Sequence, residues 1–500
     1  MLKLRTYFSG FLALLLVSCS PKSAATVAKS DGGTTLEEVA QPNLIIIHTD
    51  EHNFRTLGCY RDLMAANDAL VWGPEVKVGT PNIDRIAHEG AICDAYYAPS
   101  PVCAPSRASM MTGLYPIATD VRQNNIPMNA SMRTFAQVLK EQGYATSYVG
   151  KWHLEGEGKY TRVNNSFGWE DHSMMFNGGH APYFRLKDGW IEAINAKAFV
   201  RLKEKGETEN IHYVTDYLTD RSLAILERDK DKPFCLMLSI PDPHTPNIAR
   251  PPYDTMFSNL NYQPPATMTI IPEEDRPGWA TGKDKNYHRD FDPGYVEGYL
   301  GMVKCIDDNV GRILDFLDRE KLAQKTIIIF TSDHGDMIFE HDRNNKGVPY
   351  EASARVPFLI RFPGHIPAGK QIGTPYTMVD FAPTVLGLLG APALTNIHGT
   401  DASATFLSPK KAPSPGRITY IGTTGGNWVA AVDGHHKLIL SKNDPPYLFD
   451  LELDPQEIIN RYEDPAYAAV IKRLQPELLR QVRLYKDPST LSKGELITSH

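Results

Sequence analysis

The sequence of 500 residues is poor in cysteine and has no long run of basic residues, no internal repeat and no apolar segment of membrane-spanning length. Its six cysteines include no CxxC pair, so no disulfide framework can be assigned from spacing. With a formal net charge of −7 and no Lys/Arg run, the chain lacks the basic patch that is typical of a nucleic-acid-binding protein. Any anionic ligand must therefore be bound by a local cluster of cations.

The composition is that of a soluble globular protein, with 42% hydrophobic and 22% charged residues and enough length for a large core. Cys235 and Cys305 lie in apolar patterns and are predicted to be core residues. A disulfide between Cys59 and Cys93 remains open.

The N-terminus combines Lys3 and Arg5 with a short apolar run, 11–17, and then a Leu-Val-Ser-Cys sequence that ends at Cys19. This order resembles a bacterial lipoprotein signal. We expect a signal peptide over residues 1–18, lipidation of Cys19 and a tether over 19–41. The protein would then be an exported lipoprotein, periplasmic or anchored to the outer membrane through Cys19. The alternative is a plain signal peptide that ends near a cysteine.

Four short apolar runs rich in β-branched residues are typical of strands that are buried on both faces. Each run ends in residues that can do chemistry; the runs are 44–47, 145–149, 234–240 and 326–330. Helical patterns lie between them: one stripe is opened by Ser131 as a cap and closed by Gly143, and a longer one covers 299–317. We therefore predict an α/β fold with a large mixed or parallel sheet sandwiched by helices, and ligands at the carboxyl ends of the strands.

Domain boundaries follow from the change in pattern along the chain. We predict a catalytic domain over 42–405, a Pro/Lys/Ser-rich linker or surface loop over 408–416, and a smaller C-terminal α+β subdomain over 417–487. The segment 151–206 has weak periodicity and is predicted to form long loops that shape a pocket.

The most informative motif is Cys103-Ala-Pro-Ser-Arg107, which leads into Ala-Ser-Met-Met-Thr-Gly. An isolated cysteine would be typical of a core position, but Pro, Ser and Arg at these offsets favour a functional one. The motif resembles that of the type I, formylglycine-dependent sulfatases of the alkaline-phosphatase-like superfamily, and the resemblance covers about residues 42–460. It implies that a formylglycine-generating enzyme oxidises Cys103 to formylglycine, whose hydrated form is the nucleophile.

Carboxylates at two predicted strand ends indicate a metal site. Oxygen ligands that converge from different strands suit a hard divalent cation, Ca²⁺ or Mg²⁺, better than Zn²⁺. The resemblance implies that the ligands are Asp50, Glu51, Cys103 in its oxidised form, Asp333 and His334. Glu51 stands where the family more often has Asp, and His334 where it has either Asn or His.

The resemblance also assigns catalytic roles to five cationic or basic residues. Arg107 would brace the nucleophile and the metal ligands. Lys151, in the motif Gly-Lys-Trp-His, would contact sulfate, and His153 would be the base that collapses the intermediate. His244 would lie near the leaving group, and Lys346 would protonate the departing alkoxide or stabilise its charge.

Together these residues predict hydrolysis of sulfate esters, with sulfated oligo- or polysaccharides as substrates. Two alternatives remain at this stage. One is a phosphonate or phosphodiester hydrolase or a sulfamidase of the same superfamily. The other is a catalytically silent glycan-binding lipoprotein.

Overall fold

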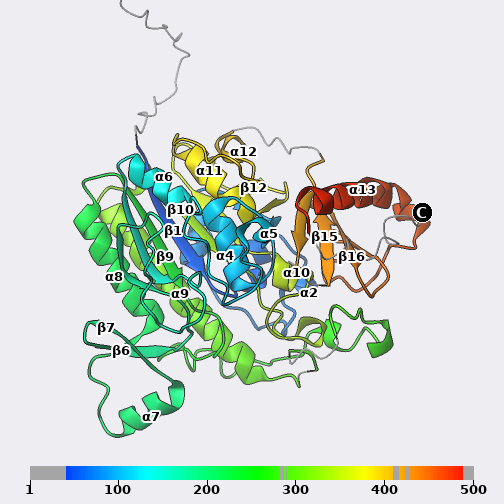
Figure 1. The fold of residues 1–500 in the computed structure, drawn as a ribbon. Coiled ribbons are helices and arrows are strands. Elements are labelled where there is room, and N and C mark those ends of the chain that lie inside the picture. The colour runs from blue at the N-terminus through cyan, green and yellow to red at the C-terminus, as the bar shows by residue number, and fades with distance from the viewer. Residues whose placement is uncertain (1–40, 282–285, 289, 409–415, 424–426, 488–500) are drawn as a thin grey trace, which may run out of the picture. The chain divides into compact units, whose positions relative to one another are not determined.

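The structure is a computed structural model that describes residues 41–281, 286–288, 290–408, 416–423 and 427–487 (Figure 1). Its main feature is an eight-stranded mixed sheet of order β12-β2-β11-β10-β1-β9-β4-β5. The strands are β12 (Lys370–Ile372), β2 (Ala91–Cys93), β11 (Phe358–Arg361), β10 (Thr326–Ser332), β1 (Asn43–Thr49), β9 (Phe234–Ile240), β4 (Ala145–Lys151) and β5 (Asp171–Phe176). The strands from β10 to β5 run parallel, and β11 is antiparallel to both β10 and β2.

The four predicted apolar runs form the four central parallel strands, β10, β1, β9 and β4. Every residue of β1, β9 and β10 is buried. Along β1, Leu44 and Ile46 pack into one apolar cluster, whereas Ile45 and Ile47 pack into another. The sheet is therefore covered on both faces, as continuous apolar strands require.

Helices supply both covering layers (Figure 1). The cluster on one face includes residues of α4 (Cys103–Thr112), α6 (Phe135–Glu141), α11 (Phe381–Leu388) and α12 (Ser403–Leu407). The cluster on the other face includes residues of α1 (Gly58–Arg61), α3 (Pro81–His88), α8 (Val214–Asp229) and α9 (Pro293–Arg319). The predicted sandwich of helices around a mixed sheet is confirmed.

Two sequence predictions were wrong in detail. Helix α6 begins after Thr134, which forms a capping box with Gln137, so Ser131 is not its cap. The segment 151–206 is not only loops: it contains β5, a hairpin and a helix. Many residues of these elements are exposed or half-buried, so they show no continuous apolar run. These elements are β6 (Tyr183–Lys187), β7 (Trp190–Ile194) and α7 (Ala196–Glu204), and β6 also pairs with β8 (Ile211–Tyr213).

The C-terminal part forms a separate antiparallel sheet of order β14-β15-β16-β17. Its strands are β14 (Thr419–Gly422), β15 (Trp428–Val432), β16 (His436–Ser441) and β17 (Tyr447–Asp450), and α13 (Ala468–Leu484) packs on one face. The other face contributes Trp428 and Phe449 to a cluster that contains Tyr97 and Tyr350. The predicted smaller α+β subdomain is confirmed.

Short elements complete the described fold: α2 (Ala66–Ala69), α5 (Pro116–Thr119), α10 (Glu351–Ala354), β3 (Tyr96–Tyr97) and β13 (Tyr376–Thr377). Cys59 and Cys93 are both free thiols, so they form no disulfide, and Cys235 and Cys305 are core residues as predicted. Among the described residues, no helix is long and apolar enough to cross a membrane. The predicted signal peptide, nearly all of the predicted tether and most of the predicted linker lie outside those residues, and the domain boundaries remain predictions.

Candidate active site

Four adjacent parallel strands deliver the candidate residues to one edge of the sheet. Because β10, β1, β9 and β4 run in the same direction, their carboxyl ends lie side by side. Asp333 follows β10, Asp50 follows β1, His244 lies in the turn after β9, and Lys151 is the last residue of β4. The strand-end rule therefore placed these four residues correctly.

Cys103 is the first residue of α4 and is buried. Its Sγ lies 3.2 Å from His334 Nε2 and 3.8 Å from Asp50 Oδ1. Burial and the Asp50 carboxylate raise the pKa of the Cys103 thiol, but Lys151, Lys346 and His334 outweigh both and hold it well below its usual range. The thiol thus lies in a strongly electropositive pocket, which is typical of a reactive cysteine.

Arg107 lies one helical turn after Cys103 and joins the carboxyl ends of four strands, β10, β1, β4 and β9. Its guanidinium donates to Asp333 Oδ2 at 2.8 Å and to Asp50 Oδ2 at 2.9 Å. It also donates to the Lys151 carbonyl oxygen at 2.7 Å and to Ser239 Oγ at 2.8 Å. Arg107 is buried and all its nitrogens are engaged by protein groups, so it braces the carboxylates instead of reaching for a ligand.

Four buried side chains offer a metal site. Ligand atoms of Asp50, Cys103, Asp333 and His334 all lie within 4.8 Å of one another. Burial and the Asp50 carboxylate raise the pKa of Asp333, which is the physical signature of two carboxylates that share one dry space. Burial alone would lower the pKa of His334, but the Asp333 carboxylate outweighs this effect, and the pKa is raised to about 9. Paired carboxylate oxygens in this setting fit a hard divalent cation, which would relieve their repulsion.

Glu51 was predicted as a further metal ligand, but it is not one of these four converging residues. Its Oε2 instead lies 3.0 Å from Lys346 Nζ and 2.9 Å from His244 Nε2. The backbone at Glu51 has φ of 62°, and its N–H donates to Asp333 Oδ1 at 3.2 Å. The main chain thus contacts the metal site while the carboxylate points to the other two residues; its ligation of a metal stays a prediction.

On the β4 side of Cys103, Lys151, His153 and His180 form a second group. The Lys151 ammonium pairs with Asp50 and lies 2.6 Å from His180 Nε2. Burial and Lys151 lower the pKa of His153, whereas a hydrogen bond with the Cys103 side chain raises it, and the result is a lowered value. His153 is thus suited to accept a proton at neutral pH.

His180 is a site residue that sequence reasoning missed. Its ring stacks on the His244 ring with centroids 3.6 Å apart. It follows β5 in the sequence Asn177-Gly-Gly-His180, so a strand end was again the available signal. That strand was hidden because only its last residues, Met174 to Phe176, are buried.

Lys346 and His244 form a third group at the mouth of the site. Lys346 Nζ lies 2.8 Å from His244 Nε2. Both residues line a cavity of about 900 Å³, together with Thr245, Asn286, His288, Asp290, Asp292, Tyr295, Phe339, Asn344 and Asn345. The cavity is large enough for a sugar ring and opens directly onto the two residues predicted to act on a leaving group.

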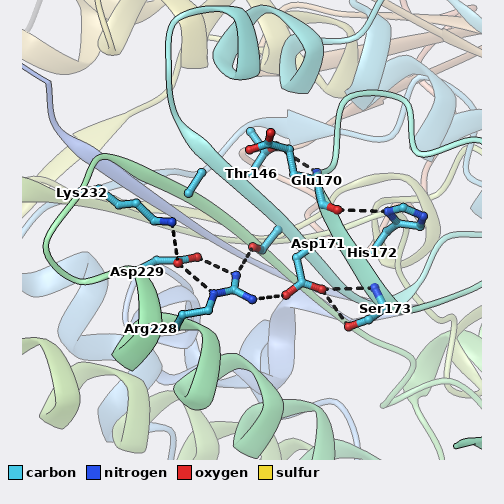
Figure 2. Close-up of a pocket in the computed structure, with 10 residues that line it drawn as sticks. Thr146, Glu170, Asp171, His172, Ser173, Arg228, Asp229 and Lys232 are labelled. Carbon is cyan, nitrogen blue, oxygen red and sulfur yellow. Dashed lines mark hydrogen bonds and ion pairs between the residues drawn. The ribbon is translucent and has the colours of Figure 1, made fainter.

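A second hollow, of about 550 Å³, lies at the opposite end of β4, around Thr146 (Figure 2). There Arg228 pairs with Asp171 and Asp229, and Asp229 also pairs with Lys232 at 3.0 Å. These charges neutralise one another at the amino end of the strand. The hollow is therefore not a candidate active site.

The arrangement suits a hydrolase of anionic esters, because it combines a buried thiol of lowered pKa, a candidate metal site and nearby cations. The Sulfatase family model matches residues 42–391, and the chain belongs to this family. A second family model, the N-sulphoglucosamine sulphohydrolase C-terminal region, matches residues 339–483. The protein is thus a sulfuric ester hydrolase, as the motifs predicted.

Individual relatives agree with this assignment. An N-acetylglucosamine-6-O-sulfatase of Bacteroides thetaiotaomicron is 28% identical, and the alignment covers 90% of this chain and 88% of the relative. An ulvan-active sulfatase of Formosa agariphila is 26% identical, and the alignment covers 94% of this chain and 85% of the relative. A solved structure of a protein in complex with its substrate D-glucosamine-2-N,6-O-disulfate matches with a TM-score of 0.72 and 26% identity. The match covers 90% of this chain and 99% of that protein. A phosphonate monoester hydrolase of Agrobacterium radiobacter, at 21% identity and a TM-score of 0.64, shows the same fold.

Proposed function

We propose that the protein hydrolyses sulfate esters of a sulfated oligo- or polysaccharide. The observation that carries the proposal is the setting of Cys103: its Sγ and ligand atoms of Asp50, Asp333 and His334 lie within 4.8 Å of one another, and Lys151 and Lys346 lower the pKa of its thiol. Lys346 also lines the cavity with His244. The relatives named for N-acetylglucosamine-6-sulfate and ulvan, and the glucosamine disulfate complex, support a carbohydrate as the alcohol.

The proposal includes a chemical modification of Cys103 and a bound divalent cation. Oxidation of Cys103 by a formylglycine-generating enzyme would supply a hydrated aldehyde, with one hydroxyl to attack sulfur and a second that allows sulfate to leave. A divalent cation, Ca²⁺ or Mg²⁺, held by Asp50, Asp333, His334 and the oxidised side chain of residue 103, would supply positive charge beside a sulfate oxygen.

The chain's own residues bind and orient the sulfate group. Lys151 and His180 present adjacent nitrogen atoms, and Lys346 presents its ammonium next to His244, whose ring stacks on His180. Because Lys151, His180 and Lys346 are buried or half-buried, their interactions with a sulfate oxygen act in a water-poor site and are strong. Arg107 keeps Asp50 and Asp333 fixed while this happens.

Two proton movements follow from the geometry. His153 contacts the side chain of residue 103 and accepts the proton that must leave it when sulfate is released. Lys346 and His244 lie at the cavity and deliver a proton to the bridging ester oxygen as its bond to sulfur breaks, so that the sugar departs as an alcohol.

The cell location is proposed from the N-terminal sequence alone. Cleavage before Cys19 and lipidation of this residue would anchor the enzyme in the periplasm or at the outer membrane. Labelling with a radioactive fatty acid, with Cys19→Ser as the control, tests the anchor.

The activity is tested with protein purified from its native host, whose Cys103 peptide is analysed by mass spectrometry. We expect residue 103 as formylglycine and the highest kcat/KM with a sulfate ester, compared with a matched phosphodiester and a matched sulfamate. A preference for the phosphodiester or the sulfamate would assign the protein to one of the alternative hydrolases. Unmodified Cys103 with no hydrolysis would indicate a glycan-binding protein.

A further inference from the structure

The chain that immediately follows Lys346 is held by the C-terminal sheet. Trp428 Nε1, on β15, donates to the Gly347 carbonyl oxygen at 3.2 Å. Lys437 Nζ, on β16, donates to the Pro349 carbonyl oxygen at 2.7 Å. These contacts fix the main chain within three residues of the Lys346 Cα.

A buried charge cluster completes this attachment. Lys437 Nζ lies 2.7 Å from Glu351 Oε1 and 2.8 Å from Glu457 Oε1, and its side chain is fully buried. Glu457 Oε2 accepts from the Glu351 backbone N–H at 2.6 Å. The Lys437 ammonium donates to the Pro349 carbonyl oxygen and to Glu457 Oε1, and its contact with Glu351 Oε1 is an ion pair. Removing one partner of such a buried ion pair is costly, because it leaves an uncompensated buried charge.

Groups of the catalytic domain also hold Lys346. Its ammonium lies 3.0 Å from Glu51 Oε2 and 2.8 Å from His244 Nε2, and the Gly347 N–H donates to Ser353 Oγ at 3.1 Å. Lys346 lies in the loop between β10 and α10, and Gly347 has φ of 93°. On its other side, the Asn345 N–H donates to Asp336 Oδ1 at 2.7 Å. Lys346 is therefore held between an anchor in the catalytic domain and an anchor in the C-terminal sheet.

We propose that Trp428, Lys437 and Glu457 are positioning residues for the hydrolysis, and that the C-terminal sheet sets the place of the Lys346 ammonium beside the leaving-group oxygen. The proposal rests on the proposed role of Lys346. None of the three touches substrate; they act through the main chain at residues 347–351. The smaller subdomain thereby contributes to catalysis as well as to the fold.

Trp428→Phe is the sharpest variant. It removes the N–H that donates to the Gly347 carbonyl oxygen and keeps an aromatic ring in the apolar cluster with Tyr97 and Tyr350. A displaced ammonium matters most when the leaving alkoxide is basic. We expect kcat for a sugar sulfate to fall about 10-fold and kcat for nitrophenyl sulfate less than about twofold, with KM little changed. Tyr420→Phe is the matched control: it removes a hydroxyl of the same sheet that bonds Asp487, away from residues 347–351. It should leave both rates unchanged.

A double-mutant cycle shows whether Trp428 acts through Lys346. In a Lys346→Ala background, Trp428→Phe should cause no further loss, because the group it positions is gone. A further 10-fold loss in that background, or equal losses on both substrates, would overturn the proposal. If instead Lys346→Ala alone lowers both rates equally, the proposed role of Lys346 fails, which is a distinguishable result.

Lys437→Arg and Lys437→Met give a second route to the same answer. Arg keeps the charge and the donors, so it should retain more sugar-sulfate activity than Met at equal formylglycine content, as measured by mass spectrometry. Thermal midpoints identify variants that are merely unfolded. Equal activity of folded Met and wild-type proteins on the sugar sulfate would contradict the role of Lys437.

Discussion

The Glu51 carboxylate lies 3.0 Å from the Lys346 ammonium, although Glu51 stands at a position where the resemblance implied a metal ligand. This ion pair, with His244 2.9 Å from the same oxygen, connects Glu51 to leaving-group chemistry. Its carboxylate can hold both residues at the cavity before a substrate enters.

Glu51→Gln should therefore lower the hydrolysis of sugar sulfates more than that of nitrophenyl sulfate, because Lys346 and His244 lose their shared partner. Metal content, measured by elemental analysis, should remain one ion per chain. Loss of the metal, with equal losses on both substrates, would show that Glu51 is a metal ligand after all.

His180→Ala should weaken sulfate binding, because the nitrogen beside Lys151 is lost. A hydrogen bond to a charged group supports an expected decrease in kcat/KM of about 10- to 100-fold. The decrease should be similar for good and poor leaving groups. His172→Ala, in the remote hollow of Figure 2, is the control and should have wild-type kinetics.

Asp333→Ala removes one of the paired carboxylates and the partner of Arg107. We expect loss of bound divalent cation and a decrease in kcat/KM of more than about 10³-fold. Elemental analysis and a turnover assay measure both effects. Full activity of wild-type protein after complete removal of metal would contradict the metal site.

Cys103→Ser should give at most one turnover per active site. A serine hydroxyl can be presented to sulfur by the same cations, but serine lacks the second hydroxyl that lets sulfate leave. A stable sulfate on the substituted serine should appear as a mass gain of that peptide. Steady turnover by this variant, or by wild-type protein with unmodified Cys103, would refute the formylglycine mechanism.

Stability should fall in mild acid because of His341. Burial lowers the pKa of His341 to about 3, while an unfolded histidine binds a proton below about pH 6.5. The unfolded state thus takes up the proton first, and stability decreases by up to about 1.4 kcal/mol per pH unit between these values. In thermal unfolding, His341→Gln should depend less on pH between 5 and 7 than wild type. The exposed His435→Gln variant should not differ from wild type in this respect.

The sequence was most informative where apolar runs end. Asp50, Lys151 and Asp333 follow runs that are buried on both faces, and parallel pairing alone brings their ends together. His180 escaped because half of β5 faces solvent, which breaks the apolar run. The direction of the Glu51 carboxylate depends on a positive φ and on Lys346, almost 300 residues away. The C-terminal anchor of Lys346 likewise depends on tertiary contacts that leave no local pattern.

Because Arg107 braces Asp50 and Asp333, the free-energy cost of bringing these two carboxylates together arises during folding. The four contacts of Arg107 join two carboxylates and the ends of β4 and β9 to α4 in one rigid unit. The unfavourable gathering of like charges is therefore completed once, during folding, and need not be repeated in each catalytic cycle. The substrate therefore meets a preorganised electrostatic field. The cost of assembling this field lowers the free energy of unfolding and does not slow turnover.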